Sequence, residues 1–96
     1  MSHRKLPVPK TVMISYEGNS QSLAFRIRDF LENKGLKVLI DTEGIRSEFL
    51  QWKGDAVKSS DAVILLLTPK YEQSKNCLFE AKLAHELGKK IIPLVG

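Results

Sequence analysis

The stretch Ala62-Val63-Ile64-Leu65-Leu66-Leu67 is the most apolar run of this sequence, and it decides the fold. Polar residues bound it, because Ser60 and Asp61 precede it and Thr68 follows it. A short, continuous apolar run of this kind is typical of a strand that is buried on both faces, as in a parallel sheet. We therefore predict a central β-strand at residues 62–67.

Three further segments have the short apolar pattern of strands. Residues 11–15 and 36–40 are rich in aliphatic and β-branched side chains, and so is the stretch 91–95. Pro93 lacks the amide hydrogen that a central strand donates, so it places the last of these strands at an edge of the sheet. We predict a sheet that contains all four segments.

Helical periodicity separates these strands. We predict helices over residues 20–34, 48–59 and 76–87, with room for one helical turn in the loop 68–75. Ser20 is a suitable N-cap for the first helix, and glycines follow the first and third helices, as left-handed C-caps require. The apolar residues that we expect on one face of the first helix are Leu23, Ile27, Phe30 and Leu31.

Strands that alternate with helices along the chain indicate right-handed βαβ units and a parallel sheet. We expect a flavodoxin-like, three-layer α/β fold with strand order 2-1-3-4, which places residues 36–40 and 91–95 at the two edges. Ligands of such folds bind beyond the carboxyl ends of the strands, where the order reverses between strands 1 and 3. The loops at that point are residues 16–19 and 68–75.

Composition and charge restrict the class of protein. With 96 residues and 43% hydrophobic content the chain suits one small globular domain, and no apolar run approaches the ~20 residues of a membrane span. We expect residues 1–10 to form a basic flexible tail and residues 11–96 to form the domain. Beyond the tail, 12 basic residues accompany 11 acidic ones, which argues against a nucleic-acid partner. A single cysteine suits a reducing, cytoplasmic location, and the scattered histidines predict no metal site.

Glu80 is an acidic residue in the middle of the apolar stripe of the third predicted helix. At roughly 100° per residue, Cys77, Leu83, Ala84 and Leu87 all lie within about 60° of it. An unpaired carboxylate on a helix face that packs against the core is unfavourable. Glu80 therefore either has a buried partner or lines a cavity that a ligand fills. Its helix starts from a loop at the expected crevice, which puts Glu80 near the expected ligand site.

Polar and aromatic residues near the same crevice are further candidates. Tyr16 could stack on a base or a nicotinamide ring, or it could pack on the edge of the sheet. Ser15 could hydrogen-bond a ligand, or it could simply end its strand. Asp41 and Glu43 could hold ribose hydroxyl groups or belong to an assembly surface, with plain loop polarity as the alternative.

Six stretches of the sequence together form a family pattern: Val12-Met13-Ile14-Ser15-Tyr16, Asp41 after the second strand, Ser59-Ser60-Asp61, Thr68-Pro69-Lys70-Tyr71-Glu72-Gln73-Ser74, Asn76-Cys77-Leu78-Phe79-Glu80 and Lys90-Ile91-Ile92-Pro93-Leu94. In these motifs the sequence resembles the TIR (Toll/interleukin-1 receptor) domains over residues 11–96. Many members of that family have Trp where this chain has Asn76, and the family domain usually continues through a fifth strand and a last helix. We therefore expect this chain to be a C-terminally truncated form that lacks both.

The resemblance implies self-association with other TIR domains in innate immune or cell-death signalling. In a subset of the family it also implies hydrolysis of NAD at the nicotinamide–ribose bond, with the glutamate of a Cys-x-x-Glu motif as the catalytic residue. That glutamate is Glu80 in this chain, and NAD would be its substrate rather than a bound cofactor. The residues we assign to NAD binding are Ser15, Tyr16, Asp41, Glu43 and Asn76, and those we assign to the assembly loop are Gly44, Ile45 and Arg46.

Three interpretations remain at this stage. The chain is an NAD-cleaving TIR domain, or a TIR adaptor that acts only by assembly, or an unrelated flavodoxin-like domain that senses a phosphate or nucleotide. The last is disfavoured, because the sequence has neither a glycine-rich phosphate loop nor a cluster of acidic residues.

Overall fold

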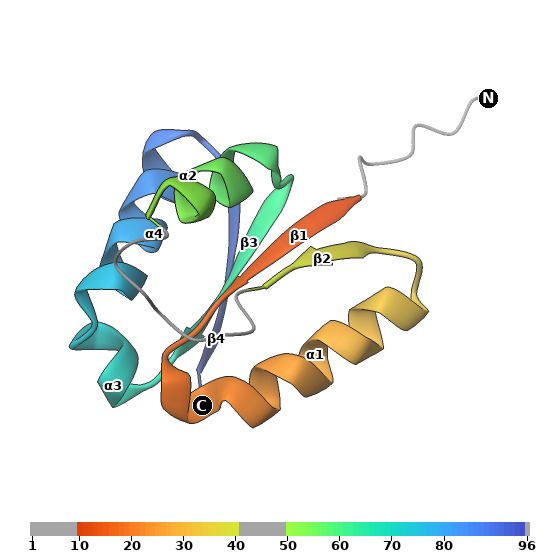
Figure 1. The fold of residues 1–96 in the computed structure, drawn as a ribbon, viewed down its shortest axis with the longest axis horizontal. Helices are drawn as coiled ribbons and strands as arrows, with labels where there is room; N and C mark the ends of the chain where they lie inside the picture. Colours follow the sequence, from red (N-terminus) through yellow and green to blue (C-terminus); the bar gives the residue numbers. More distant parts are fainter. Residues whose placement is uncertain (1–9, 41–49, 96) are drawn as a thin grey trace.

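The computed structural model describes residues 10–40 and 50–95 of the chain, with the backbone alone at 50–53 and 76. Within these residues the strands form one sheet of order β2-β1-β3-β4, and all neighbours pair in parallel. The sheet order and the edge positions of β2 and β4 confirm the prediction from the sequence (Figure 1). The strands are β1 (Thr11–Ser15), β2 (Lys37–Leu39), β3 (Ala62–Leu67) and β4 (Lys90–Val95).

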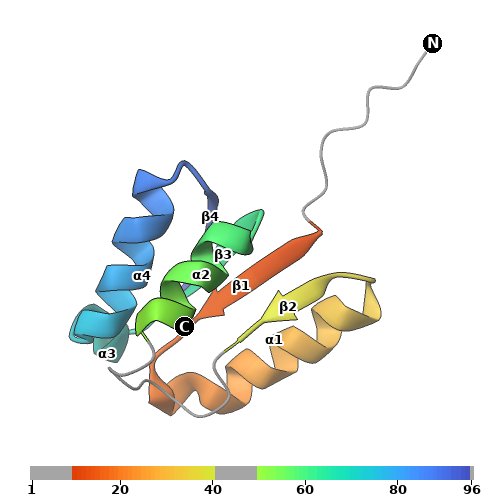
Figure 2. The same ribbon diagram turned by 45° about the horizontal axis from the view of Figure 1, so that its top comes forward.

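Helices cover both faces of this sheet, which makes three layers. Helix α1 lies on one face, and α2 and α4 lie on the other, with the short α3 at one end (Figures 1 and 2). A single 3₁₀ turn, η1, connects β1 to α1. The bounds are η1 (Gly18–Ser20), α1 (Gln21–Asn33), α2 (Leu50–Ser59), α3 (Pro69–Glu72) and α4 (Lys75–Glu86).

The central strands are apolar at every position because each has two buried faces. Ile14 and Ile64 belong to a cluster that includes Ala24 of α1, whereas their neighbours Met13 and Val63 belong to a cluster on the side of α2 and α4. Successive side chains of a strand point to opposite faces, so an uninterrupted apolar run satisfies both layers. This explains why residues 62–67 form the most apolar run of the sequence.

Local sequence signals begin the two helices near the crevice, α3 and α4. Pro69 occupies the first turn of α3, and the Thr68 hydroxyl accepts a hydrogen bond from the Tyr71 amide at 3.1 Å. The Ser74 hydroxyl caps α4 in the same way through the Cys77 amide, at 3.2 Å. The turn for which the sequence left room in the loop 68–75 is therefore α3, and it leads directly into α4.

The start of α1 differs from the prediction. Ser20 occupies the N-cap position, but its side chain makes no capping hydrogen bond. The 3₁₀ turn η1 in front of α1 supplies the missing contacts, since the Gln21 amide bonds to the Gly18 carbonyl. Glu17 caps this turn instead, and its carboxylate accepts from the Asn19 amide at 2.9 Å.

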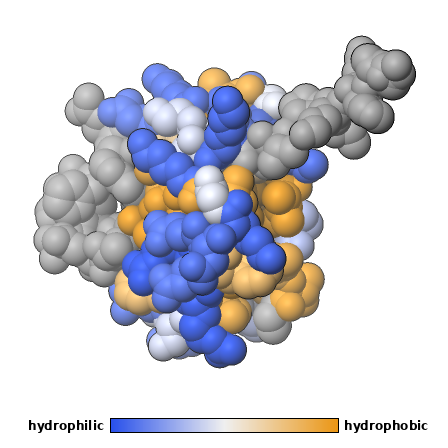
Figure 3. Space-filling view, turned by 90° about the vertical axis from the view of Figure 1, so that its right-hand side faces the viewer, coloured by the Kyte–Doolittle hydropathy of each residue, from blue (hydrophilic) through white to orange (hydrophobic). Residues whose placement is uncertain are grey.

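The predicted apolar faces are wrong at three residues. Phe30 is 59% exposed and Leu23 is 40% exposed, whereas Ala24 is fully buried and packs with Ile27 of the same helix. The buried stripe of α1 is therefore narrower than its apolar content suggests, and larger residues lie at its margins. Leu87 is also exposed, because α4 ends at Glu86 and Leu87 is its C-cap. Figure 3 shows apolar surface between hydrophilic side chains on the side that lies at the right of Figure 1.

Candidate functional site

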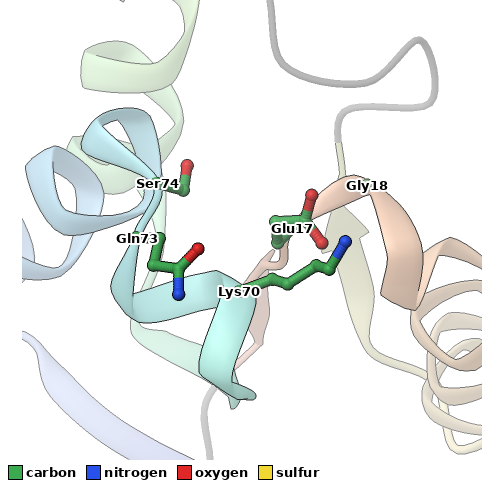
Figure 4. Close-up of a pocket in the computed structure, with 5 residues that line it drawn as sticks. All are labelled: Glu17, Gly18, Lys70, Gln73 and Ser74. Carbon is green, nitrogen blue, oxygen red and sulfur yellow. The ribbon is translucent and has the colours of Figure 1, made fainter.

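A cavity of about 500 Å³ opens between the loop after β1 and the segment after β3. The strand order predicts a crevice at this point, because the chain leaves β1 and β3 toward opposite faces of the sheet. Two residues of its lining follow β1, and three lie on α3 or at the start of α4 (Figure 4). The lining residues are Glu17, Gly18, Lys70, Gln73 and Ser74.

The lining of this cavity is polar and has charges of both signs. The Lys70 side chain extends from α3 toward the side of Glu17 and Gly18 (Figure 4). The carboxylate of Glu17 is oriented by its hydrogen bond from the Asn19 amide at 2.9 Å. An ammonium group opposite a carboxylate and an amide can bind a ligand that has both an anionic group and hydroxyl groups.

A buried polar cluster, formed by Ser15, Tyr71 and Glu80 with the Cys77 carbonyl, joins β1, α3 and α4. The Ser15 hydroxyl donates to Oε1 of Glu80 at 2.5 Å, and it lies 2.8 Å from the Tyr71 hydroxyl. Tyr71 also donates to the carbonyl of Cys77 at 3.1 Å. The exposed fraction of Ser15, Tyr71 and Glu80 is 1% each, so water does not compete for these contacts.

Each member of the buried polar cluster occupies a defined place in its element. Ser15 is the last residue of β1, where the sheet opens toward the crevice. Cys77 and Glu80 are separated by three positions on α4, so they lie on one face of the helix. Burial raises the pKa of the Tyr71 phenol, which the hydrogen bond with Ser15 partly opposes, so the phenol is neutral.

Helix α3 contributes both to the cavity and to the buried polar cluster. Lys70 of α3 and Gln73, its C-cap residue, line the cavity, whereas Tyr71 of α3 is buried in the core and contacts Ser15. Glu80 is not among the lining residues. Of the two explanations for an acidic residue on this helix face, the structure shows a buried partner, which is Ser15.

The structure places the other candidate residues as follows. Tyr16 is 4% exposed and packs in the core cluster with Ala24 and Ile64. In this structure its ring therefore packs against the protein. Asn76 lies in the first turn of α4, and its side chain is not described. The remaining candidates, Asp41, Glu43, Gly44, Ile45 and Arg46, lie outside the described residues.

Reasoning from the sequence predicted the two loops that supply the cavity lining, residues 16–19 and 68–75, but it did not single out Tyr71. Tyr71 is the only aromatic residue in the loop 68–75, and it follows a Thr-Pro pair that can start a helical turn. That combination is a signal for a short helix with one buried side chain. It does not reveal the contact with Ser15, which lies 56 positions away in the chain.

In residues 10–40 and 50–95, no group of three or more His, Cys, Asp or Glu side chains could hold a metal ion. Among the helices of this described part, none is long and apolar enough to cross a membrane.

The fold and the crevice define the class as a flavodoxin-like α/β domain. Comparison with known proteins identifies the family, because the sequence model of TIR domains matches residues 12–96. The chain belongs to the TIR domain family, as its motifs indicated.

A solved structure supports the same fold. The crystal structure of the TIR domain of the Toll-related receptor TRR-2 from Hydra magnipapillata is similar, with a TM-score of 0.72 and 22% identity. The match covers 85% of this chain and 66% of that chain. The search of curated protein sequences finds no match.

Proposed function

We propose that this TIR domain cleaves NAD at the nicotinamide–ribose bond and acts in innate immune or cell-death signalling by assembly with other TIR domains. One observation above all supports the proposal. The Glu80 carboxyl group is held by Ser15 at the carboxyl end of β1, and Ser15 also contacts Tyr71 of α3, whose neighbour Lys70 lines the crevice. A carboxyl group at the switch point of such a sheet is suitably placed to meet a ligand.

The chemistry requires only one carboxylate. Nicotinamide leaves as a neutral base, so no general acid has to protonate it, and positive charge develops on the ribose as in glycoside hydrolysis. An ionised Glu80 would stabilise that charge at short range. Lys70 would hold phosphate oxygens, and Glu17 and Gln73 would accept hydrogen bonds from hydroxyl groups or the amide of the substrate.

Glu80→Gln tests the catalytic role. We expect NAD consumption by concentrated protein to be abolished, because an amide has the same shape but no negative charge. Glu86→Gln is the matched control, since Glu86 is an exposed carboxyl on the same helix and should leave turnover unchanged. Wild-type turnover in a folded Glu80→Gln variant would refute the assignment.

A second candidate function is assembly without catalysis. The observation that favours it is the burial of Glu80, whose carboxyl group is 1% exposed and bonded to Ser15, as a purely structural residue would be. In this case the wild type would consume no NAD even when assembled. Glu80→Gln would then lower the free energy of unfolding by about 1–3 kcal/mol, because it weakens a buried charged hydrogen bond.

Assembly itself is tested at Ile45, the one large apolar residue of the loop 41–47. We expect Ile45→Asp to weaken self-association in light scattering while leaving the melting temperature unchanged, because exposed apolar side chains often anchor partner surfaces. Ser47→Asp adds the same charge to the same loop without removing an apolar side chain, and it is the matched control. Unchanged assembly of Ile45→Asp would place the contacts elsewhere.

A further inference from the structure

Tyr71 contacts Ser15, the partner of Glu80, and its neighbour Lys70 lines the cavity. Its ring is 1% exposed and belongs to the core cluster that also contains Cys77 and Ala84. Its hydroxyl group contacts both the end of β1, at Ser15, and the carbonyl of Cys77 on α4. Lys70 of the same four-residue turn lines the cavity, together with Gln73, which follows the turn.

The number of available protons decides how firmly Tyr71 is held. The buried polar cluster has three oxygen–oxygen contacts, from Glu80 to Ser15, from Ser15 to Tyr71 and from Tyr71 to the Cys77 carbonyl. Ser15 donates its hydroxyl proton to Glu80, and Tyr71 donates its own to the Cys77 carbonyl. Both hydroxyl protons are then used, so the contact between Ser15 and Tyr71 has no hydrogen of its own, and the bond to the Cys77 carbonyl is the one that holds the Tyr71 hydroxyl.

We propose that Tyr71 is a positioning residue that closes the site over Glu80, and that the site opens when the Tyr71 hydroxyl leaves Ser15 and the Cys77 carbonyl. The predicted effect on NAD turnover rests on the proposed function, but the opening itself can be measured without NAD.

The short length of α3 makes local opening feasible. Its four residues are held at the start by the Thr68 cap and at the centre by the Tyr71 side chain. A turn that depends on few contacts can open without unfolding of the sheet. Tyr71→Phe removes the hydroxyl group but keeps the ring that fills the core, so it isolates the hydrogen bonds from the packing.

The labelling rate of the Cys77 thiol can be used to measure this opening. Cys77 is the only cysteine of the chain, it is fully buried, and its own carbonyl is bonded by Tyr71. A water-soluble aromatic disulfide reagent labels the thiol only when the site opens, through attack of the thiolate and release of the aromatic thiolate. We expect Tyr71→Phe to label on the order of tenfold faster than wild type at low denaturant, because one net hydrogen bond is lost.

The dependence on denaturant separates local opening from global unfolding. Local opening exposes little surface, so the labelling rate of Tyr71→Phe should be nearly independent of urea at low concentration, and it should rise only near the unfolding midpoint. Glu72→Gln changes an exposed residue of the same turn and is the matched control, with labelling within about twofold of wild type.

Turnover provides the second readout. If the competent state is the open one, its larger population in Tyr71→Phe lowers KM for NAD by the same factor that raises the labelling rate, with kcat unchanged. A merely structural role of Tyr71 would instead lower kcat together with the melting temperature. Absence of NAD cleavage in both proteins, with faster labelling in Tyr71→Phe, would refute the proposed function and leave the closing role supported.

Two results would overturn the closing role. One is equal labelling of wild type and Tyr71→Phe at low denaturant. The other is labelling that, in both proteins, requires global unfolding, with the full denaturant dependence of the unfolding transition.

Discussion

The buried hydroxyl group of Ser15 links a carboxyl group to a phenol, because it donates to Glu80 and contacts the Tyr71 hydroxyl. Buried polar groups are expensive to leave without partners, so the serine stabilises two neighbours at once. Ser60 offers a contrast within the described chain. It is equally buried, but its hydroxyl donates only to the Ala56 carbonyl, at 2.6 Å.

We predict that Ser15→Ala lowers the free energy of unfolding by about 1–3 kcal/mol, because it removes a partner from both Glu80 and Tyr71. Ser60→Ala is the matched control, and its expected loss is only about 1 kcal/mol, the net value of an ordinary hydrogen bond. Urea unfolding of both variants measures the difference. Equal losses would show that the contacts of Ser15 do not act together.

At the scale of elements, the backbone conformation of single glycines decides where helices end. Gly35 follows α1 with φ of +90°, a conformation that side chains with a Cβ atom rarely adopt. Gly54 lies inside α2, and a Cβ atom added there meets only Leu83 Cδ2 at 3.9 Å, an ordinary contact. Glycine therefore stabilises the end of α1 at position 35, whereas at position 54 it weakens helix α2.

We expect opposite effects from the same substitution at these two glycines. Gly35→Ala should destabilise the protein by about 1 kcal/mol, because alanine is strained at positive φ. Gly54→Ala should stabilise it by up to about 1 kcal/mol, because alanine is the better helix former. Thermal unfolding of the two variants side by side is the measurement. A stabilising Gly35→Ala would contradict the assigned end of α1.

The starts of β1 and β3 are joined by Asp61. Its carboxylate accepts hydrogen bonds from the Lys10 and Thr11 amides, at 3.0 and 3.1 Å, and its own amide donates to the Thr11 carbonyl. The hydrogen bond from the Thr11 backbone, followed by that from Lys10, lowers the pKa of Asp61 from its usual value of 3.8. The link therefore depends on an ionised carboxylate.

This lowered pKa predicts a specific sensitivity to acid. A depressed folded-state pKa contributes stability above the ordinary value of 3.8, and that contribution is lost as the pH falls through the folded-state pKa. Melting temperatures measured from neutral pH into this acidic range should therefore fall less steeply for Asp61→Asn than for wild type. Asp55→Asn, an exposed carboxyl on α2, is the control for removal of one negative charge. Identical profiles for Asp61→Asn and wild type would contradict the role of this link.

At the scale of the whole molecule, the two edges of the described sheet differ. The edge strand β2 begins with the exposed Lys37, a charge that disfavours pairing with another strand. The edge strand β4 ends in Leu94 and Val95, which are 40% and 86% exposed. These two residues also line an apolar groove of about 130 Å³ against α1, together with Leu23. Exposed apolar surface at a sheet edge favours association.

We predict that the 96-residue chain forms dimers or larger species at high concentration, and that Val95→Lys shifts it toward monomers. A charge at the β4 edge would oppose pairing as Lys37 does at the other edge. Light scattering over a concentration series measures the mass. A wild type that stays monomeric at the highest concentration would show that this edge does not mediate association.

The sequence by itself determined the features that depend on neighbours in the chain. The apolar run 62–67 specified a strand with two buried faces, the glycines after α1 and α4 specified where these helices end, and the alternation of strands and helices led to the order 2-1-3-4. Such signals arise from hydrogen bonds and side-chain directions within a few residues, so they are visible in one dimension.

Only the tertiary structure decided which residue meets Glu80. Its partner Ser15 lies 65 positions before it in the chain. Tyr71 of α3, which contacts the same hydroxyl group, lies 56 positions after Ser15. Helical periodicity showed that Glu80 faces the core, but it left open whether a protein group or a ligand contacts its carboxyl group. The answer depends on how β1, α3 and α4 converge in space, and packing across long separations, rather than local propensity, determines that convergence.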